Sequence, residues 1–313
     1  MNNSDRPCKS PEDLLAALEK AEYVCSRKIA MTLLVALHLG KPVLVEGPAG
    51  VGKTELAKKA AEIFRLPFIR LQCYEGLDES KALYEWKYGK QLLYTQILKD
   101  RLNEIVNGEA SLTGAVQSLH QYDDLFFSSR FLEPRPLLQA LQHPEGAVLL
   151  IDEIDKSDEE FEAFLLEILS DFQVSIPEIG TVKATSRPMV FLTSNDTREL
   201  GDALKRRCLH LYIPFPDVAL ESRIVAVRVP GVSDVLRKQL VSFIQEVRKL
   251  HLKKTPSISE TIDWARTLLF LHAEFLSGEL VSETASVFLK FESDVETLRE
   301  SLPELLRKTV RGA

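Results

Sequence analysis

The sequence EGPAGVGKT at residues 46–54 fits the phosphate-binding pattern G-x-x-x-x-G-K-[ST]. A short apolar run of strand type, residues 42–45, precedes it, and helix formers follow from Glu55 to Arg65. A strand, a glycine-rich loop and a helix form the setting in which this pattern binds phosphates. A glycine turn followed by an unrelated lysine is the alternative, but both flanks and every required position are filled. The stretch therefore predicts a site for a nucleoside triphosphate.

The residue types of this loop suit a bound triphosphate. Glycines let the backbone turn tightly and point its N–H groups at phosphate oxygens, and the helix N-terminus adds a favourable dipole. Lys53 would reach the β- and γ-phosphates, and the Thr54 hydroxyl would ligate Mg²⁺. The expected nucleotide-binding residues of the loop are Gly47, Pro48, Ala49, Gly50, Val51, Gly52, Lys53 and Thr54.

Composition limits the class of protein and its partners. The 313 residues suffice for two domains, and contents of 45% hydrophobic and 27% charged residues are ordinary for a soluble globular protein. A net charge of −7 argues against a general nucleic-acid-binding surface. The sequence shows no apolar leader, no stretch of about 18 apolar residues, and four cysteines without metal-like or disulfide-like spacing. We therefore expect a cytoplasmic protein without a membrane span.

Apolar runs predict the order of elements along the chain. Residues 1–9 read as a loose tail, and Ser10 with Pro11 begins the first helix. An apolar helix from Ile29 to Leu39 stops before the first strand. Short apolar-rich runs predict strands at residues 42–45, 68–72, 147–151, 189–193 and 209–213. The unbroken run at 147–151 is of the kind expected in a parallel sheet covered on both faces.

Aromatic residues gather in an insert at about residues 74–96, directly after the second strand. Tyr84, Trp86 and Tyr88 alternate at period two, and a turn at residues 89–90 would close a small hairpin. These aromatics either pack within the fold or form a contact surface for a partner or a central pore.

The remaining chain divides at the prolines after the last strand. Residues 97–142 are expected to be helical around a polar middle, 107–124, and a second hairpin is expected at about residues 172–184. Beyond Pro214–Pro216 the pattern is helical to the end. We therefore expect an α/β nucleotide-binding domain at residues 10–215 and a helical lid domain at residues 216–313.

Two carboxylates, Asp152 and Glu153, follow the apolar strand that ends at Ile151. In a P-loop ATPase the first acid helps to hold hydrated Mg²⁺, and the second orients or deprotonates the attacking water. An acidic helix cap is the alternative for an apolar run followed by Asp-Glu. Because the phosphate loop precedes this pair in the same chain, we interpret the two acids as catalytic.

Two further polar positions stand beside the later strands. Asn195 follows strand 189–193, where a neutral amide would help to position the lytic water; a plain turn asparagine is the alternative. Arg206 and Arg207 directly precede the last strand. In oligomeric ATPases such an arginine enters the neighbouring site and offsets charge on the transferring phosphate. A solvated basic turn is the alternative at this position.

The stretches GPAGVGKT, VLLIDEID, FLTSN and ALKRRC, in this order and spacing, resemble the AAA+ ATPases. The aromatic insert and the hairpin before Asn195 resemble the MoxR branch, and RFLEPRPLLQAL and PSISETIDWAR look closest to its CoxD-like subgroup. The resemblance runs from about residue 10 to residue 275. It implies a P-loop AAA+ core with a five-stranded parallel sheet of order 5-1-4-3-2, and a C-terminal all-helical lid.

The resemblance also implies a function. It implies an ATP-hydrolysing, chaperone-like remodeller that uses ATP and Mg²⁺ and forms a hexameric ring. It further implies a partner with a von Willebrand factor A domain and a metalloenzyme client of the carbon monoxide dehydrogenase type, whose metal cofactor it helps to mature. By position it assigns the phosphate-loop pair Lys53 and Thr54, the Walker B acids Asp152 and Glu153, Asn195 as sensor 1, and Arg207 as arginine finger with Arg206 in reserve; Thr54 and Asp152 would bind the metal.

One position departs from the family pattern. Many MoxR proteins carry a lid arginine in a Ser-Pro-Arg run at a helix start, where this chain has Ser257-Ile258-Ser259. Arg266 lies two helical turns further on, about 10.5 Å along the same face. It either substitutes for the missing sensor-2 arginine or is a surface residue.

Two other functions compete with the remodeller. A nucleic-acid-directed AAA+ motor is opposed by the net acidity and by the lack of an added DNA-binding module. A nucleotide-gated scaffold with little turnover is opposed by the intact Glu153.

Overall fold

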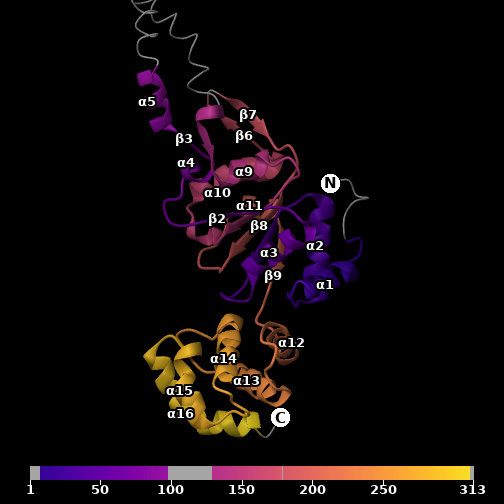
Figure 1. Ribbon diagram of the computed structural model, residues 1–313, viewed down its shortest axis with the longest axis vertical. Helices are drawn as coiled ribbons and strands as arrows, with labels where there is room; N and C mark the ends of the chain where they lie inside the picture. Colours follow the sequence, from indigo (N-terminus) through magenta and orange to yellow (C-terminus); the bar gives the residue numbers. More distant parts are fainter. Residues whose placement is uncertain (1–7, 98–128, 178, 311–313) are drawn as a thin grey trace, which may run out of the picture.

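The computed structural model describes residues 8–97, 129–177 and 179–310. Figure 1 shows an α/β part and a helical part, which are joined by one extended segment after the last strand of the sheet. Within the described ranges, no helix combines the length and the hydropathy that a membrane span requires.

Two helices, α1 (Pro11–Lys20) and α2 (Arg27–Leu39), precede the first strand. The Ser10 hydroxyl accepts a hydrogen bond from the Asp13 backbone N–H (3.1 Å), and the Asp13 carboxylate accepts one from the Ser10 N–H (3.0 Å). This reciprocal cap confirms the predicted helix start. Gly40 ends α2 in the left-handed conformation, which confirms the predicted stop.

Five parallel strands form the central sheet in the order β2-β5-β8-β1-β9. When the five strands are renumbered 1 to 5 in chain order and the sheet is read from β9, the order is 5-1-4-3-2, as expected. Every residue of β5 and β8 is buried, and this burial on both faces explains their continuous apolar runs. The strands are β1 (Val43–Glu46), β2 (Phe68–Gln72), β5 (Val148–Asp152), β8 (Met189–Ser194) and β9 (Leu209–Tyr212).

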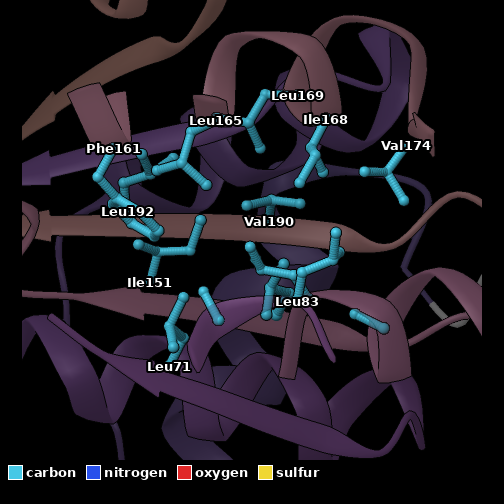
Figure 2. Packing of buried hydrophobic residues seen from close by; sticks show 14 of the residues in the cluster. Leu71, Leu83, Ile151, Phe161, Leu165, Ile168, Leu169, Val174, Val190 and Leu192 are labelled. Atoms are coloured by element: carbon cyan, nitrogen blue, oxygen red, sulfur yellow. The ribbon is translucent and has the colours of Figure 1, made fainter. Parts of the chain in front are cut away.

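Helices cover both faces of this sheet. They include α3 (Lys53–Phe64), α9 (Pro136–Gln142), α10 (Glu159–Asp171) and α11 (Asp202–Arg207). On one face α9 and α10 pack on the sheet, and Figure 2 shows Leu165 and Ile168 of α10 beside Val190 of β8. On the other face α1, α2 and α3 form a second cluster, which includes the buried Cys8 of the predicted tail. Residues 1–7 lie outside the described part.

The insert after β2 differs from the predicted hairpin. After α4 (Glu79–Ala82), strand β3 (Tyr84–Trp86) pairs antiparallel with β4 (Leu132–Pro134), which follows a 3₁₀ turn at residues 129–131. Residues 88–97 form helix α5 (Tyr88–Ile97), so the predicted turn at residues 89–90 is wrong. The aromatic alternation identified β3, but its partner is remote in sequence and left no local signal. The polar middle predicted at residues 107–124 lies outside the described residues.

The second predicted hairpin is confirmed. Strands β6 (Gln173–Ile176) and β7 (Gly180–Lys183) pair antiparallel between α10 and β8. Helix α10 begins after Asp158, whose carboxylate accepts a hydrogen bond from the Phe161 N–H at 2.8 Å. A 3₁₀ turn at residues 154–156 joins β5 to this helix.

All of the described elements after residue 217 are helices. They are α12 (Val218–Arg228), α13 (Asp234–Val247), α14 (Ile258–Phe270), α15 (Gly278–Phe288) and α16 (Glu292–Val310). Their own core centres on the rings of Phe243, Trp264 and Phe288, whose centroids lie 4.5 to 6.4 Å apart. The helical region thus folds around a cluster of its own.

A buried ion pair joins three of these helices to the segment that leads into them. Arg248, the C-cap residue of α13, binds Glu221 of α12 through two hydrogen bonds of 2.6 and 2.7 Å, and Glu221 is fully buried. Thr261 of α14 donates to the same carboxylate at 2.8 Å. The Arg248 guanidinium also lies 4.9 Å from the ring centre of Phe215. The pair therefore fixes the helical region to its connecting segment.

Arg248→Ala is expected to lower the free energy of unfolding of the helical region by about 3–5 kcal/mol, because it leaves the buried Glu221 carboxylate without its counter-charge. Urea unfolding followed by tryptophan fluorescence measures this loss, with Trp86→Phe present in both variants so that the signal comes from Trp264. Arg266→Ala is the control, since its pair with Asp263 is half-exposed and worth less than about 1 kcal/mol. Equal unfolding midpoints for the two variants would contradict the role given to Arg248.

Candidate functional site

The phosphate loop and the ends of two strands enclose a polar cavity of about 270 Å³, called here the phosphate cavity. Parallel strands bring their carboxyl ends to one edge of a sheet, which is where such sheets bind ligands. Every residue predicted for the metal, the base and sensor 1 is at this edge. The lining residues are Ala49, Gly50, Gly52, Lys53, Thr54, Glu55, Lys58, Asp152, Glu153, Thr193, Asn195 and Ser259.

Two glycines of the loop are required by the space around them. Gly47 has φ +144°, and a Cβ there would lie 2.1 Å from the carbonyl oxygen of Ile213. Gly50 has φ +74°, and a Cβ there would lie 2.2 Å from the Oγ of Ser257, at the start of α14. The loop is therefore pressed against the end of the sheet on one side and against the helical region on the other.

Gly47→Ala is expected to lower both the melting temperature and the affinity for ADP, because the clash is with backbone that cannot rotate away. Gly76→Ala is the matched control, with φ +77° and open space around its Cβ. It should cost only the left-handed backbone penalty of about 1–2 kcal/mol. Thermal melting with and without ADP separates the two variants, and equal losses would contradict a steric role for Gly47.

Lys53 is buried and held by the loop itself. Its Nζ donates to the carbonyl oxygens of Gly47 (2.6 Å) and Pro48 (2.8 Å) and to Oδ1 of Asn195 (2.7 Å). Burial lowers the pKa of Lys53, while the nearby carboxylates of Asp155, Asp152 and Glu153 oppose this shift. The structure thus brings the predicted phosphate-loop lysine and the predicted sensor-1 asparagine into direct contact.

Asp155 positions Asn195 on the neighbouring strand end. Its Oδ2 accepts hydrogen bonds from the backbone N–H groups of Asn195 (3.2 Å) and Thr197 (3.1 Å), and from the Thr197 hydroxyl. Asp155 is 4% exposed. The VLLIDEID stretch therefore supplies a third functional acid, which we did not assign from sequence because its partners lie on another strand.

Thr54 and Asp152 offer the oxygen ligands that a divalent cation requires. The Thr54 hydroxyl donates to the two carboxylate oxygens of Asp152 at 3.1 and 3.2 Å, and the Thr193 hydroxyl donates to Oδ1. No group of three or more His, Cys, Asp or Glu side chains suited to a metal occurs in the described part of the chain.

Glu153 adopts a left-handed backbone conformation with φ +58°. Its N–H donates to the Thr193 hydroxyl at 2.9 Å. Its carboxylate oxygen Oε2 accepts from Gln72 Nε2 (2.8 Å) and from Lys156 Nζ (2.5 Å). The predicted base therefore lies in the phosphate cavity but is held by two side chains that sequence reasoning missed. Gln72 and Arg70 share one face of β2 at its carboxyl end. Two polar residues spaced two apart in this strand were the sequence signal that could have predicted a contact with the site.

A second cavity, of about 200 Å³, adjoins the first and is called here the nucleobase cavity. The two cavities share Gly50, Gly52, Glu55 and Ser259. Apolar walls suit a nucleobase, as ligand pockets are mostly apolar. Its apolar side chains include Val24, Ile29, Ile213, Leu220, Ile224 and Ile262. A further cavity, of about 430 Å³, lies at the opposite strand ends beside Lys41 and Arg187 and contains none of the predicted site residues.

Arg206 and Arg207, the two residues predicted as arginine fingers, do not line the phosphate cavity of their own chain. Arg207 is exposed at the end of α11, where its Nε donates to Ser170 Oγ (2.6 Å) and its guanidinium to the Ala203 carbonyl (3.0 Å). Arg206 is exposed as well. Neither is among the residues that line the phosphate cavity of the same chain. The structure therefore does not bring these arginines to their own site.

The helical region reaches the site through other residues than Arg266. Arg266 is exposed and pairs with Asp263 on its own helix at 3.5 Å. Arg228 at the end of α12 lines the nucleobase cavity and pairs with Glu55, one residue after Thr54, at 3.4 Å. Among the arginines of the described helical region, Arg228 is thus the one that touches the nucleotide site.

The match to a family model agrees with this geometry. Residues 42–208, more than half of the chain, match the family described as "AAA domain (dynein-related subfamily)". An uncharacterised protein of Staphylococcus aureus (strain bovine RF122 / ET3-1) is 26% identical over 240 residues, 74% of this chain and 77% of its own. One of Staphylococcus epidermidis is 25% identical over 241 residues, 75% and 78% of the two chains. The Thermotoga maritima RuvB Holliday junction branch migration motor superposes with a TM-score of 0.47 and 17% identity, covering 96% of this chain and 80% of that one.

Proposed function

This chain belongs to the AAA domain family, dynein-related subfamily, and is an ATPase; from that membership we propose that it uses ATP hydrolysis to remodel a protein client within a homo-oligomeric ring. The observation that carries the proposal is the convergence of Lys53, Asn195 and the Thr54–Asp152 pair in one cavity. We assign residues 10–215 to the nucleotide-binding domain and residues 216–313 to the lid.

Each side chain of the phosphate cavity has a role in this proposal. Lys53 would exchange its carbonyl partners for the β- and γ-phosphates. Thr54 and Asp152 would hold Mg²⁺, which neutralises charge on the phosphate oxygens when bound. Glu153 would accept a proton from the attacking water, and Asn195 would hold that water or the γ-phosphate beside Lys53.

The placement of the arginines supports the proposed ring. AAA+ proteins commonly form oligomeric rings, and we propose a hexamer here. Arg207, with Arg206 as the alternative, lies outside the cavity of its own chain and would complete the site of the next subunit. Such a shared site makes hydrolysis depend on assembly.

For the client we propose a metalloenzyme whose metal cofactor is matured with help from a partner that carries a von Willebrand factor A domain. The resemblance of RFLEPRPLLQAL and PSISETIDWAR to the CoxD-like subgroup of MoxR proteins supports this choice. The four cysteines are free and buried, which supports a reducing, cytoplasmic setting. The net charge of −7 weighs against the alternative of a nucleic-acid-directed motor.

A substrate-trap experiment tests the proposed client class. Tagged Glu153→Gln protein, loaded with ATP, would hold its client because binding persists without turnover. Lys53→Ala protein is the matched control, since it would lack the ATP-bound state. We expect a von Willebrand factor A domain protein and a metalloenzyme to copurify with the first variant only. Capture of nucleic acid, or the same proteins on both variants, would contradict the proposal.

A further inference from the structure

Arg70, on the edge strand β2, already pairs with Asp152, the carboxylate that would hold the metal. Arg70 of β2 donates to Asp152 Oδ2 through Nε (2.9 Å), and its second nitrogen lies 2.6 Å from the same oxygen. The Asp152 side chain is 3% exposed, whereas that of Arg70 is 46% exposed. A buried acid is therefore paired with an arginine that has free space on its outer side.

The Asp152 carboxylate has no oxygen left over in this arrangement. Oδ1 accepts from Thr54 and Thr193, and Oδ2 accepts from Thr54 and Arg70. A divalent cation bound beside Thr54 would stand close to the guanidinium, and two like charges a few ångströms apart repel strongly where water is scarce. The two cations therefore cannot both bind this carboxylate at full strength.

We propose that Arg70 is an internal cation that competes with Mg²⁺ for Asp152, an inference that rests on the proposed ATPase site. Before the metal arrives, Asp152 needs a counter-charge, because an unpaired buried carboxylate is costly. Arg70 supplies that charge and can swing outward into solvent when Mg²⁺ enters with the nucleotide. Its return after hydrolysis favours release of the metal with the product.

The same arginine links the metal-binding acid to the base. Arg70 also donates to the Gln72 side-chain oxygen, and Gln72 Nε2 donates to Glu153 at 2.8 Å. Displacement of Arg70 therefore removes the contact that orients the Gln72 amide on Glu153. Arrival of the metal at Asp152 is coupled in this way to loosening of the Gln72 contact on Glu153, which leaves Lys156 as the remaining side-chain partner of the base described here.

A Mg²⁺ titration of the ADP-bound protein tests the competition without measuring turnover. The readout is the MgCl₂ concentration that gives half of the Mg²⁺-dependent rise in melting temperature. Arg70→Gln should lower this concentration about tenfold, the effect of losing one charge-assisted competitor. Arg135→Gln is the matched control, because its side chain is 45% exposed and pairs with Glu85 away from the site. It should leave the concentration unchanged.

Three outcomes distinguish the claims. If ADP itself fails to stabilise the parent protein, the proposed nucleotide site is wrong. If ADP binds but Arg70→Gln needs as much Mg²⁺ as the parent, or more, the competition is wrong and Arg70 only orients Asp152. Should Arg70→Gln not fold, Arg70→Lys decides: a lysine lacks the two-pronged contact, so a lower half-point is expected and an unchanged or higher one overturns the proposal.

Discussion

Subunits carrying Arg207→Ala and subunits carrying Lys53→Ala are expected to recover ATPase activity when mixed, although each variant alone is nearly inactive. Arg207 lies at the end of α11, bound to Ser170 and outside the phosphate cavity of its own chain. An arginine that enters a neighbouring site contributes about 10³–10⁵ in rate. In a mixed ring, an intact Arg207 from one subunit meets an intact phosphate loop on the next.

The size of the recovery is itself a test. If the subunits mix at random in equal amounts, about one quarter of the interfaces carry both intact parts, so about a quarter of the parent rate should return. Arg206→Ala in place of Arg207→Ala shows which arginine is the finger. Absence of recovery for both, in mixtures shown to co-assemble, would mean that neither arginine serves a neighbour.

Glu153→Gln is expected to retain ATP binding and to lower the rate of phosphate release by about 10²–10⁴, the usual contribution of a general base. Glutamine has the same shape, but its amide cannot take a proton from water. Glu62→Gln is the control, because Glu62 lies on α3 in an exposed pair with Lys59. Calorimetry and a phosphate-release assay on the same samples separate binding from turnover. Release at the parent rate would remove Glu153 from the mechanism.

Local patterns predicted the parts of the fold that are specified locally. The five core strands were visible as short apolar-rich runs, and these runs are unbroken at residues 148–151 and 189–192 because β5 and β8 are buried on both faces. The β6–β7 hairpin was predictable because its two strands are neighbours in sequence. The insert was predicted wrongly, since the alternation of Tyr84 and Trp86 says nothing about a partner that begins at Leu132.

The candidate site shows the same division. Short sequence motifs were enough to predict the roles of Lys53, Thr54, Asp152 and Glu153. The structure places these four residues in one cavity. The residues that hold them were missed because contacts between separate elements have no fixed sequence spacing. Arg70 and Gln72 contact the acids from β2, and Asp155 contacts Asn195 from the 3₁₀ turn after β5.

The central claim, that the cavity around Lys53 is the ATP site, is tested most directly by calorimetric titration of ATP into the parent protein and into Lys53→Ala. Lys53 contacts Gly47, Pro48 and Asn195, so its removal takes the buried cation away from the phosphates. The account predicts saturable binding to the parent and none to Lys53→Ala at the same concentrations, with both proteins melting cooperatively. Equal affinity of the two folded proteins for ATP would contradict it.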